Sequence, residues 1–179
     1  MLDNIEIKEL SLDDISNNIL DNFNRYEEVE KFYVKENGNW IVKNIKDVLN
    51  WDKNKKNNII EIFSEAIIEG GYVFGAYDNK KMIGFSVLLN NKFGFKKNYI
   101  RLKFLHVSFK YRHKGIGKIL FELCVEKAKS MGIEKIYISA ANSEAAQIFY
   151  LGVGCKDAME INKIAAENEP YDRQMEYII

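Results

Sequence analysis

The sequence predicts a protein of the mixed α/β (α+β) class that forms one domain over residues 1–179. Two patterns support this class. An apolar, strand-like run at 99–107 leads through a glycine-containing turn into an amphipathic helix that begins at Ile116 and ends at Gly132. Two more strand-like runs joined by a short turn, over 72–89, are typical of a β-hairpin. A chain of 179 residues with 47% hydrophobic content can bury one sizeable core.

The N-terminal half is predicted to hold a strand, two helices and one stretch without a clear pattern. Ile5, Ile7 and Leu10 suggest a first strand, and Ser11 with Asp13-Asp14 can cap a helix that runs to about Phe23. The region 24–58 mixes aromatic and charged residues, and its last six residues, 53–58, are predicted to form a polar connector. A helix over 59–70 follows and ends at a glycine pair.

The C-terminal half is predicted to be richer in strands. Asp78-Asn79 is the turn of the hairpin, and a polar loop containing Pro170 separates the last two strand candidates. The strand candidates of this half are Tyr72–Tyr77, Met82–Leu89, 99–107, 135–139, 158–161 and 174–179.

The run from Arg112 to Lys118 lies between a predicted strand and a predicted helix and is the most informative segment of the chain. Its two glycines, Gly115 and Gly117, allow the backbone to approach a ligand closely. The first N–H groups of the following helix have no acceptor within the helix and lie at the positive end of its dipole. The segment therefore predicts a phosphate-binding site.

Two other phosphate-binding motifs fit this segment poorly. A P-loop requires Ser or Thr where Ile119 stands, and a dinucleotide fingerprint requires a third glycine where Leu120 stands. Both classes of nucleotide-binding protein are therefore disfavoured.

The sequence resembles the GNAT family of N-acetyltransferases in two ordered segments. The family's acetyl-CoA signature, Gln or Arg followed by x-x-Gly-x-Gly/Ala, is matched by Arg112, Gly115 and Gly117. A strand-like run at 135–139 then leads into a short helix that ends at Tyr150, four residues before Gly154 and an apolar residue. This second segment is similar to the other cofactor-binding segment of the family.

The resemblance implies a mostly antiparallel central sheet of about seven strands flanked by helices, with a V-shaped split between the fourth and fifth strands, here 99–107 and 135–139. It implies acetyl-CoA as co-substrate, with the pantetheine arm along the fourth strand and the pyrophosphate on the loop before the helix. Asn142 or Ser143 is expected to cap the next helix. The implied cofactor-binding residues are Leu105, His106, Val107, Arg112, His113, Lys114, Gly115, Ile116, Gly117, Lys118, Asn142 and Ser143.

Tyr150 is the predicted catalytic residue, placed by the resemblance where it would stabilise or protonate the departing thiolate. A phenol of pKa about 10 is a weaker acid than a thiol of pKa about 8.5, so a hydrogen bond serves as well as full proton transfer. The predicted activity is N-acetyl transfer from acetyl-CoA to a small-molecule, peptide or protein amine by direct attack in a ternary complex. The alternative is a non-catalytic acyl-CoA-binding or interaction module.

The general base is where the sequence departs from the family pattern. Arg101 and Lys103 stand at the strand positions that carry Glu or His in several members. An amine of pKa about 10.4 is only about 0.1% neutral at pH 7.4, so acceptors of lower pKa are favoured without a base. If these two cations face the acceptor, they would also repel polyamines. His106 is another candidate for the base, although strand alternation makes it face away from Lys103 unless a bulge intervenes. Glu27, Glu28 and Glu30 are further candidates.

Composition narrows the partners and the location. Equal numbers of basic and acidic residues, 26 each, give no global attraction to nucleic acid or to an anionic membrane. No long apolar run or signal-peptide pattern is seen, so a cytoplasmic location is expected, with Cys124 and Cys155 as buried free thiols. No metal site is predicted, a homodimer is left open, and the frequent Lys, Asn and Ile suggest a bacterial genome rich in A and T.

Overall fold

The computed structural model describes residues 4–179. The first three residues of the predicted domain, which also begin the N-terminal segment without a signal-peptide pattern, lie outside the described residues. The helices are α1 (Lys53–Ile68), α2 (Ile116–Ser130), α3 (Glu144–Gly152) and α4 (Lys163–Asn168), and the strands are β1 (Ile5–Glu9), β2 (Glu27–Glu36), β3 (Asn39–Leu49), β4 (Tyr72–Asp78), β5 (Lys81–Leu88), β6 (Tyr99–Val107), β7 (Lys135–Ala140), β8 (Lys156–Asp157) and β9 (Arg173–Ile178).

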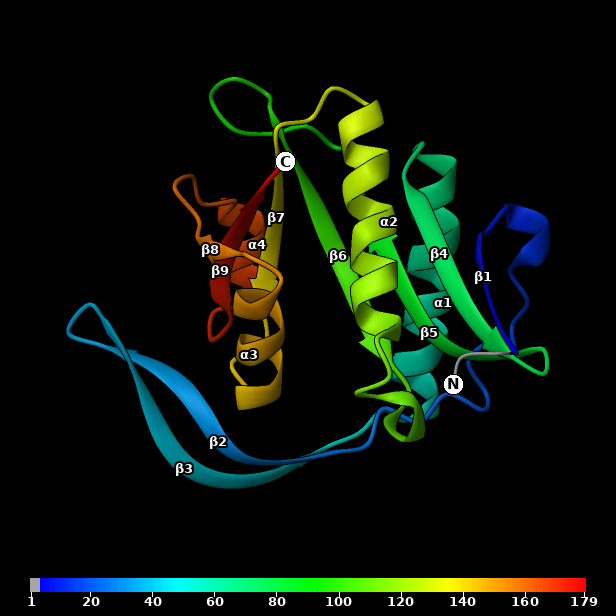
Figure 1. Cartoon of the computed structure of the whole chain (residues 1–179), viewed down its shortest axis with the longest axis horizontal. Coiled ribbons are helices and arrows are strands. Elements are labelled where there is room, and N and C mark those ends of the chain that lie inside the picture. Colours follow the sequence, from blue (N-terminus) through cyan, green and yellow to red (C-terminus); the bar gives the residue numbers. More distant parts are fainter. Residues whose placement is uncertain (1–3) are drawn as a thin grey trace.

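Seven of the strands form one sheet in the order β1-β4-β5-β6-β7-β9-β8 (Figure 1). The pair β6–β7 is parallel, and the other neighbouring pairs of this sheet are antiparallel. Helices lie on both faces of the sheet (Figure 1). The predicted class, a mostly antiparallel sheet of about seven strands flanked by helices, is confirmed.

Each face of the sheet has its own apolar layer. On one face, Leu120, Cys124 and Ala128 of α2 are spaced four residues apart and are fully buried against the sheet and α3. On the other face, Ile59 and Phe63 of α1 pack in a second cluster of buried residues. Both helices match their predictions from Ile59 and from Ile116 onward, because the sequence shows this helical periodicity.

The two central strands separate in a V. The strand β6 pairs with β7 only from Tyr99 to Leu102, opposite Lys135 to Ile138, and continues to Val107 without this partner. Figure 1 shows the two strands leaning apart toward the end at which α3 begins. The rest of β6 therefore keeps its hydrogen-bonded neighbour β5 on one side only.

The structure of the N-terminal region differs from the prediction in two places. The helix predicted over 11–23 is only a 3-10 turn, Leu12–Asp14, although the capping box of Ser11 and Asp14 is formed. The chain turns extended at Ile15, and the Ser16 hydroxyl bonds to the Asn18 side chain, a local contact that competes with a helix. The expected polar connector over 53–58 is instead the first part of α1, because Asp52 caps the helix by accepting a hydrogen bond from the Lys55 N–H.

The region without a clear pattern forms a long hairpin of β2 and β3. Its turn is Asn37-Gly38, with φ of 50° and 83°, the backbone that a two-residue type I′ turn requires. The hairpin runs below the open end of the V (Figure 1), where the Tyr33 N–H donates to the Asn142 carbonyl at 2.7 Å. It thus closes the side of the V next to α3.

The structure of the C-terminal tail also differs from the prediction. The strand expected over 158–161 is not formed: β8 ends at Asp157, and the Met159 N–H donates to the side-chain carboxylate of Glu176 at 3.0 Å instead of to a strand. The polar loop expected around Pro170 begins with α4, which Asn162 caps by accepting from the Ala165 N–H. The helix and the loop after it bring acidic residues beside the V.

The two cysteines are free and buried, as the sequence predicts. The sulfur of Cys124 lies 3.2 Å from the hydroxyl oxygen of Ser86 on β5. Burial raises the pKa of the Cys124 thiol to about 12, so this group is a poor nucleophile. No helix between residues 4 and 179 is long and apolar enough to span a membrane.

Candidate active site

A cavity of about 710 Å³ opens where β6 and β7 separate. Its walls come from β6, from the loop and first turn of α2, from α3, and from the segment after α4. The sequence-predicted residues that line it are Leu105, His106, Val107, Arg112, His113, Gly115, Ile116, Gly117, Lys118, Ser143 and Tyr150. Lys114 and Asn142 do not line it.

A β-bulge at Lys103 determines which side chains of β6 face the cavity. Leu102 pairs with Leu88 and Phe104 with Val87, so Lys103 is an extra residue on β6. Leu105 therefore packs with the α2 layer, as Leu102 does, while Phe104 lies in the α1 layer. The bulge that the sequence analysis left open is therefore present, so simple alternation does not separate His106 from Lys103, and both residues line the cavity.

The backbone between Lys103 and Val107 offers hydrogen-bonding groups on the side of β6 that has lost β7. An extended ligand can pair with such a strand edge as an additional strand would. One of these groups is already used, because the Arg112 guanidinium donates from Nε to the Val107 carbonyl at 3.1 Å. The edge thus ends at Val107, next to the loop that leads to α2.

This loop presents backbone donors to the cavity. His113 and Gly115 have φ of 60° and 85°, and Gly115 occupies the N-cap of α2 without a side chain to satisfy the first-turn N–H groups. A Cβ on Gly115 would meet nothing within 4 Å, so only the backbone conformation favours glycine there. A Cβ on Gly117 would lie 3.3 Å from the ring of Phe149, so this position is also restricted in space.

The basic side chains of the loop have other partners. Arg112 donates to the Arg25 carbonyl at 3.1 Å and lies 3.5 Å from the carboxylate of Glu27. Lys114 lies over the ring of Tyr111, 5.1 Å from its centroid, and Lys118 lies 3.8 Å from Glu122 on the outside of α2. Arg112 therefore ties the loop to the segment before β2, and the first-turn N–H groups of α2 have no acceptor within the helix.

Tyr150 lies near the end of α3 and lines the cavity with only 8% of its surface exposed. Burial is the main cause that raises its pKa well above the ordinary value, and nearby Cys155, Cys124, Asp172 and Glu169 add to this. The phenol therefore stays protonated at neutral pH. Ser143 is the N-cap of this helix, accepting a hydrogen bond from the Ala146 N–H, so it fills the capping role that the sequence left open between Ser143 and Asn142.

His106 packs edge-on against Trp51, with ring centroids 4.7 Å apart, and also contacts Phe85. Burial, together with the positive charges of Arg25, Arg112 and Lys55, holds the pKa of His106 well below its ordinary value. The imidazole is therefore neutral at neutral pH and sits in an aromatic wall of the cavity.

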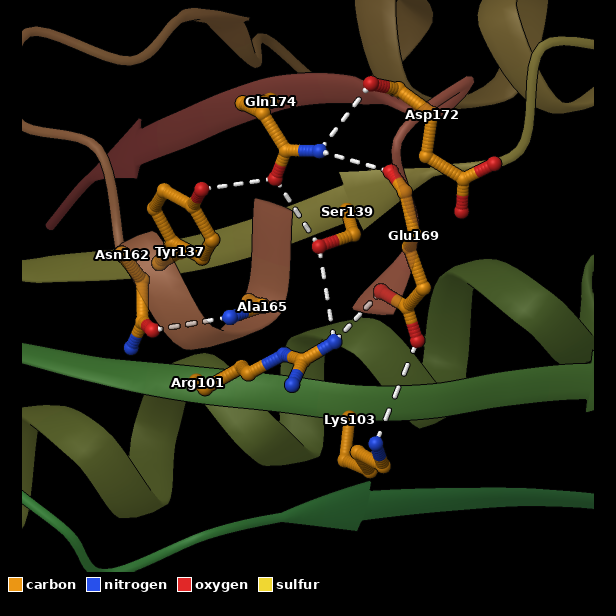
Figure 2. A network of polar contacts seen from close by, with 9 residues as sticks. All are labelled: Arg101, Lys103, Tyr137, Ser139, Asn162, Ala165, Glu169, Asp172 and Gln174. Atoms are coloured by element: carbon orange, nitrogen blue, oxygen red, sulfur yellow. Dashed lines mark hydrogen bonds and ion pairs between the residues drawn. The ribbon is translucent and has the colours of Figure 1, made fainter. Parts of the chain in front are cut away.

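The two strand cations share one carboxylate. Arg101 is 7% exposed and donates to the carboxylate of Glu169 at 2.5 Å, while Lys103 lies 3.9 Å from the same carboxylate (Figure 2). Burial, Arg101 and Lys55 lower the pKa of Lys103, and Glu169 partly offsets them. The condition for repelling polyamines, that both cations face the acceptor, is met by Lys103 alone, since Arg101 does not line the cavity and is paired with Glu169.

Acidic residues reach the cavity from two places. Of the three candidate glutamates on β2, Glu27, Glu28 and Glu30, only Glu27 lines the cavity, and its carboxylate lies 2.5 Å from the Arg25 guanidinium. Glu169 and Asp172, between α4 and β9, also line it. The sequence did not single out these two, since they lie in a polar loop far along the chain and match no motif. Among residues 4–179, no cluster of His, Cys, Asp or Glu is suited to hold a metal ion.

Comparison with known proteins agrees with this geometry. The model of the acetyltransferase (GNAT) family matches residues 42–154. A Bacillus anthracis str. Ames structure assigned as a streptothricin acetyltransferase, in complex with acetyl coenzyme A, is 20% identical, with a TM-score of 0.68 and coverage of 98% of this chain and 99% of that one. No curated protein sequence matches the chain.

Two further solved structures share the fold. Nourseothricin acetyltransferase is 15% identical, with a TM-score of 0.68 and 98% of both chains covered. The PaiA N-acetyltransferase of Thermoplasma acidophilum, in complex with coenzyme A, is 18% identical, with a TM-score of 0.60 and coverage of 98% and 99%. Because the family model matches more than half of the chain, this protein belongs to the GNAT acetyltransferase family.

Proposed function

We propose that this chain is an N-acetyltransferase that moves an acetyl group from acetyl-CoA to a primary amine by direct attack in a ternary complex. The observation that carries the proposal is one cavity lined by three features. These are the free edge of β6 from Lys103 to Val107, the N-terminus of α2, and the hydroxyl-bearing side chain of Tyr150.

The chain's own groups fit the co-substrate. Acetyl-CoA, when bound, supplies the activated thioester. The N–H groups of Ile116, Gly117 and Lys118 suit its pyrophosphate, because the first turn of a helix has no internal acceptors for them. The backbone of Leu105, His106 and Val107 suits an extended arm with amide groups.

Tyr150 has the role of hydrogen-bond donor to the departing sulfur. Its raised pKa keeps the hydroxyl protonated at neutral pH, and proton transfer to a thiolate with a pKa near 8.5 is unfavourable. A hydrogen bond to a charged group contributes about 1.5–3 kcal/mol, which corresponds to roughly 10- to 150-fold in rate. Tyr150 therefore stabilises the thiolate as it forms.

The acceptor is a small-molecule, peptide or protein amine. Because structures assigned as streptothricin and nourseothricin acetyltransferases share the fold over 98% of this chain, these two compounds are the first acceptors to test. A single domain acting in the cytoplasm agrees with the two free, buried thiols.

The test is release of free thiol from acetyl-CoA with a panel of amines: streptothricin, nourseothricin, amino acids, peptides and polyamines. We expect turnover with at least one amine. Silence across the panel, with acetyl-CoA still bound, would favour the alternative of a non-catalytic acyl-CoA-binding module.

The variant Tyr150→Phe should lose roughly 10- to 150-fold in kcat while its affinity for acetyl-CoA stays unchanged. Tyr77→Phe is the matched control, because Tyr77 is also a partly buried tyrosine but lies outside the cavity, with its pKa raised by burial to about 12. Undiminished turnover in Tyr150→Phe would remove the role assigned to this hydroxyl.

A further inference from the structure

The segment after α4 places two carboxyl groups in the wall of the cavity. The Asp172 N–H donates to the Glu169 carbonyl at 3.1 Å, which closes a turn around Pro170. The Gln174 side chain donates to the Glu169 and Asp172 carbonyls at 3.4 and 3.0 Å, and its own oxygen accepts from Tyr137 and Ser139 (Figure 2). This network fixes the turn, so both side chains are held beside Tyr150.

The two carboxyl groups differ in their partners. Glu169 is engaged by Arg101 at 2.5 Å and by Lys103 at 3.9 Å. In Figure 2 no dashed line reaches the carboxyl of Asp172, and no residue from 4 to 179 makes a hydrogen bond or ion pair with that group. Glu169 is thus committed to the cations of β6, while Asp172 keeps its oxygens available to a ligand in the cavity.

The surroundings of Asp172 increase its affinity for a proton. Burial is the largest cause, the negative charge of Glu169 adds to it, and Arg101 opposes both, so the pKa of Asp172 is raised to about 7. The other titratable groups at this wall are Lys103, which lies 3.9 Å from the Glu169 carboxylate, and Tyr150, which stays neutral. A base is most effective when its pKa lies near the working pH.

We propose that Asp172 is the general base that takes a proton from the acceptor amine, an inference that rests on the proposed acetyl transfer. The base that the sequence lacks at Arg101 and Lys103 is then supplied by another part of the cavity wall, the segment between α4 and β9. Glu169 is a positioning residue, because it acts through Asp172 and through the two cations.

The proton and bond balance is complete with these groups. An acceptor that enters as an ammonium gives one proton to the Asp172 carboxylate and becomes a neutral amine. The amine nitrogen bonds to the acetyl carbonyl carbon, the carbon–sulfur bond breaks, and the sulfur, hydrogen-bonded by Tyr150, takes the second proton of the amine. Asp172 returns its proton to water after the products leave.

The experiment compares kcat/KM of the wild type and of Asp172→Asn from pH 5.5 to 9, with the amine that the wild type uses fastest. The ratio of the two values cancels the ionisation of the substrate. We expect the ratio to be roughly 100-fold at pH 8 and to fall below pH 7 about tenfold per pH unit. The affinity for acetyl-CoA should be unchanged, and Asp172→Glu should restore part of the rate.

The matched control is Glu167→Gln, because Glu167 is exposed on α4 and does not line the cavity. A ratio near one, or a large ratio without pH dependence, overturns the role of Asp172 while the wild-type turnover still supports acetyl transfer. If the wild type acetylates no amine, the proposed function and this inference fail together.

Should Asp172→Asn not fold, Glu169→Gln gives the second test. Removing this carboxylate takes away one cause of the raised Asp172 pKa and leaves Arg101 unpaired beside it. The acidic limb of kcat/KM should then move down by at least one pH unit, and an unmoved limb overturns the inference.

Discussion

The raised pKa of Asp172 has a consequence for stability that needs no substrate. A carboxyl with a pKa of 3.8 when unfolded and about 7 when folded keeps its proton in the folded state over a window in which the unfolded chain has lost it. The free energy of unfolding therefore falls as the pH rises through this window. The variant Asp172→Asn removes this titration, so it should gain stability over the wild type above pH 7.

The magnitude follows from the shift. About three pKa units correspond to an upper limit of about 4 kcal/mol, and the opening of the cavity to water reduces this to about 1–2 kcal/mol. Urea unfolding of the protein without acetyl-CoA should show wild type and Asp172→Asn close together at pH 5, and the variant more stable by that amount at pH 8.5.

A control with the opposite sign is available in Asp14. Its hydrogen bonds with Lys8 and Ser11 lower the pKa of this carboxyl to about 2, so its contribution is lost only as the pH falls toward that value. Asp14→Asn should therefore lose a similar amount, about 0.2–1 kcal/mol, at pH 5 and pH 8.5. If Asp172→Asn likewise shows the same difference at both pH values, the reasoning on the buried carboxyl is refuted.

Two further variants test the cofactor loop and the sheet. Gly117→Val would bring a branched side chain against Phe149, so acetyl-CoA affinity measured by calorimetry should fall more than tenfold, whereas Gly152→Ala, with open space around its Cβ, should leave it unchanged. An equal effect of both would remove the steric argument. Glu176→Gln replaces a fully buried carboxylate that accepts hydrogen bonds from Tyr99 and the Met159 N–H and lies 3.4 Å from the Lys135 ammonium. The free energy of unfolding measured in urea should therefore fall by about 3 kcal/mol, and a fall below about 1 kcal/mol would contradict this.

The parts of the fold that the sequence predicts well are those with a strong period. The helix from Ile116 and the hairpin of β4 and β5 follow directly from their apolar spacing. The hairpin of β2 and β3 lacks such a period because β3 is exposed along most of its length. Its Asn37-Gly38 turn is nevertheless a sequence signal for a hairpin, although no hairpin was predicted there. Propensity alone also misplaced the start of α1, where one cap at Asp52 overrides a run of lysine and asparagine.

The part of the site that one contiguous segment forms could be predicted from the sequence, whereas the part that distant segments form together could not. The loop from Arg112 to Lys118 is local, since its glycines and the helix that follows are contiguous. The acid wall, which is the part of the cavity wall formed by Glu169 and Asp172, depends on three features that are distant in the sequence. These are the bulge at Lys103, the salt bridge of Arg101 to Glu169, and the turn that holds Asp172. None of these leaves a pattern in the sequence.

The bulge and the acid wall are physically linked. Without the extra residue at Lys103, the alternation of β6 would continue and the side chains beyond it would exchange faces. Arg101 and Lys103 both reach Glu169, so one carboxylate offsets part of the positive charge that the strand carries. A strand that carries Arg101 and Lys103 is compatible with the proposed amine chemistry, because the segment between α4 and β9 places the carboxyl groups of Glu169 and Asp172 in the cavity wall.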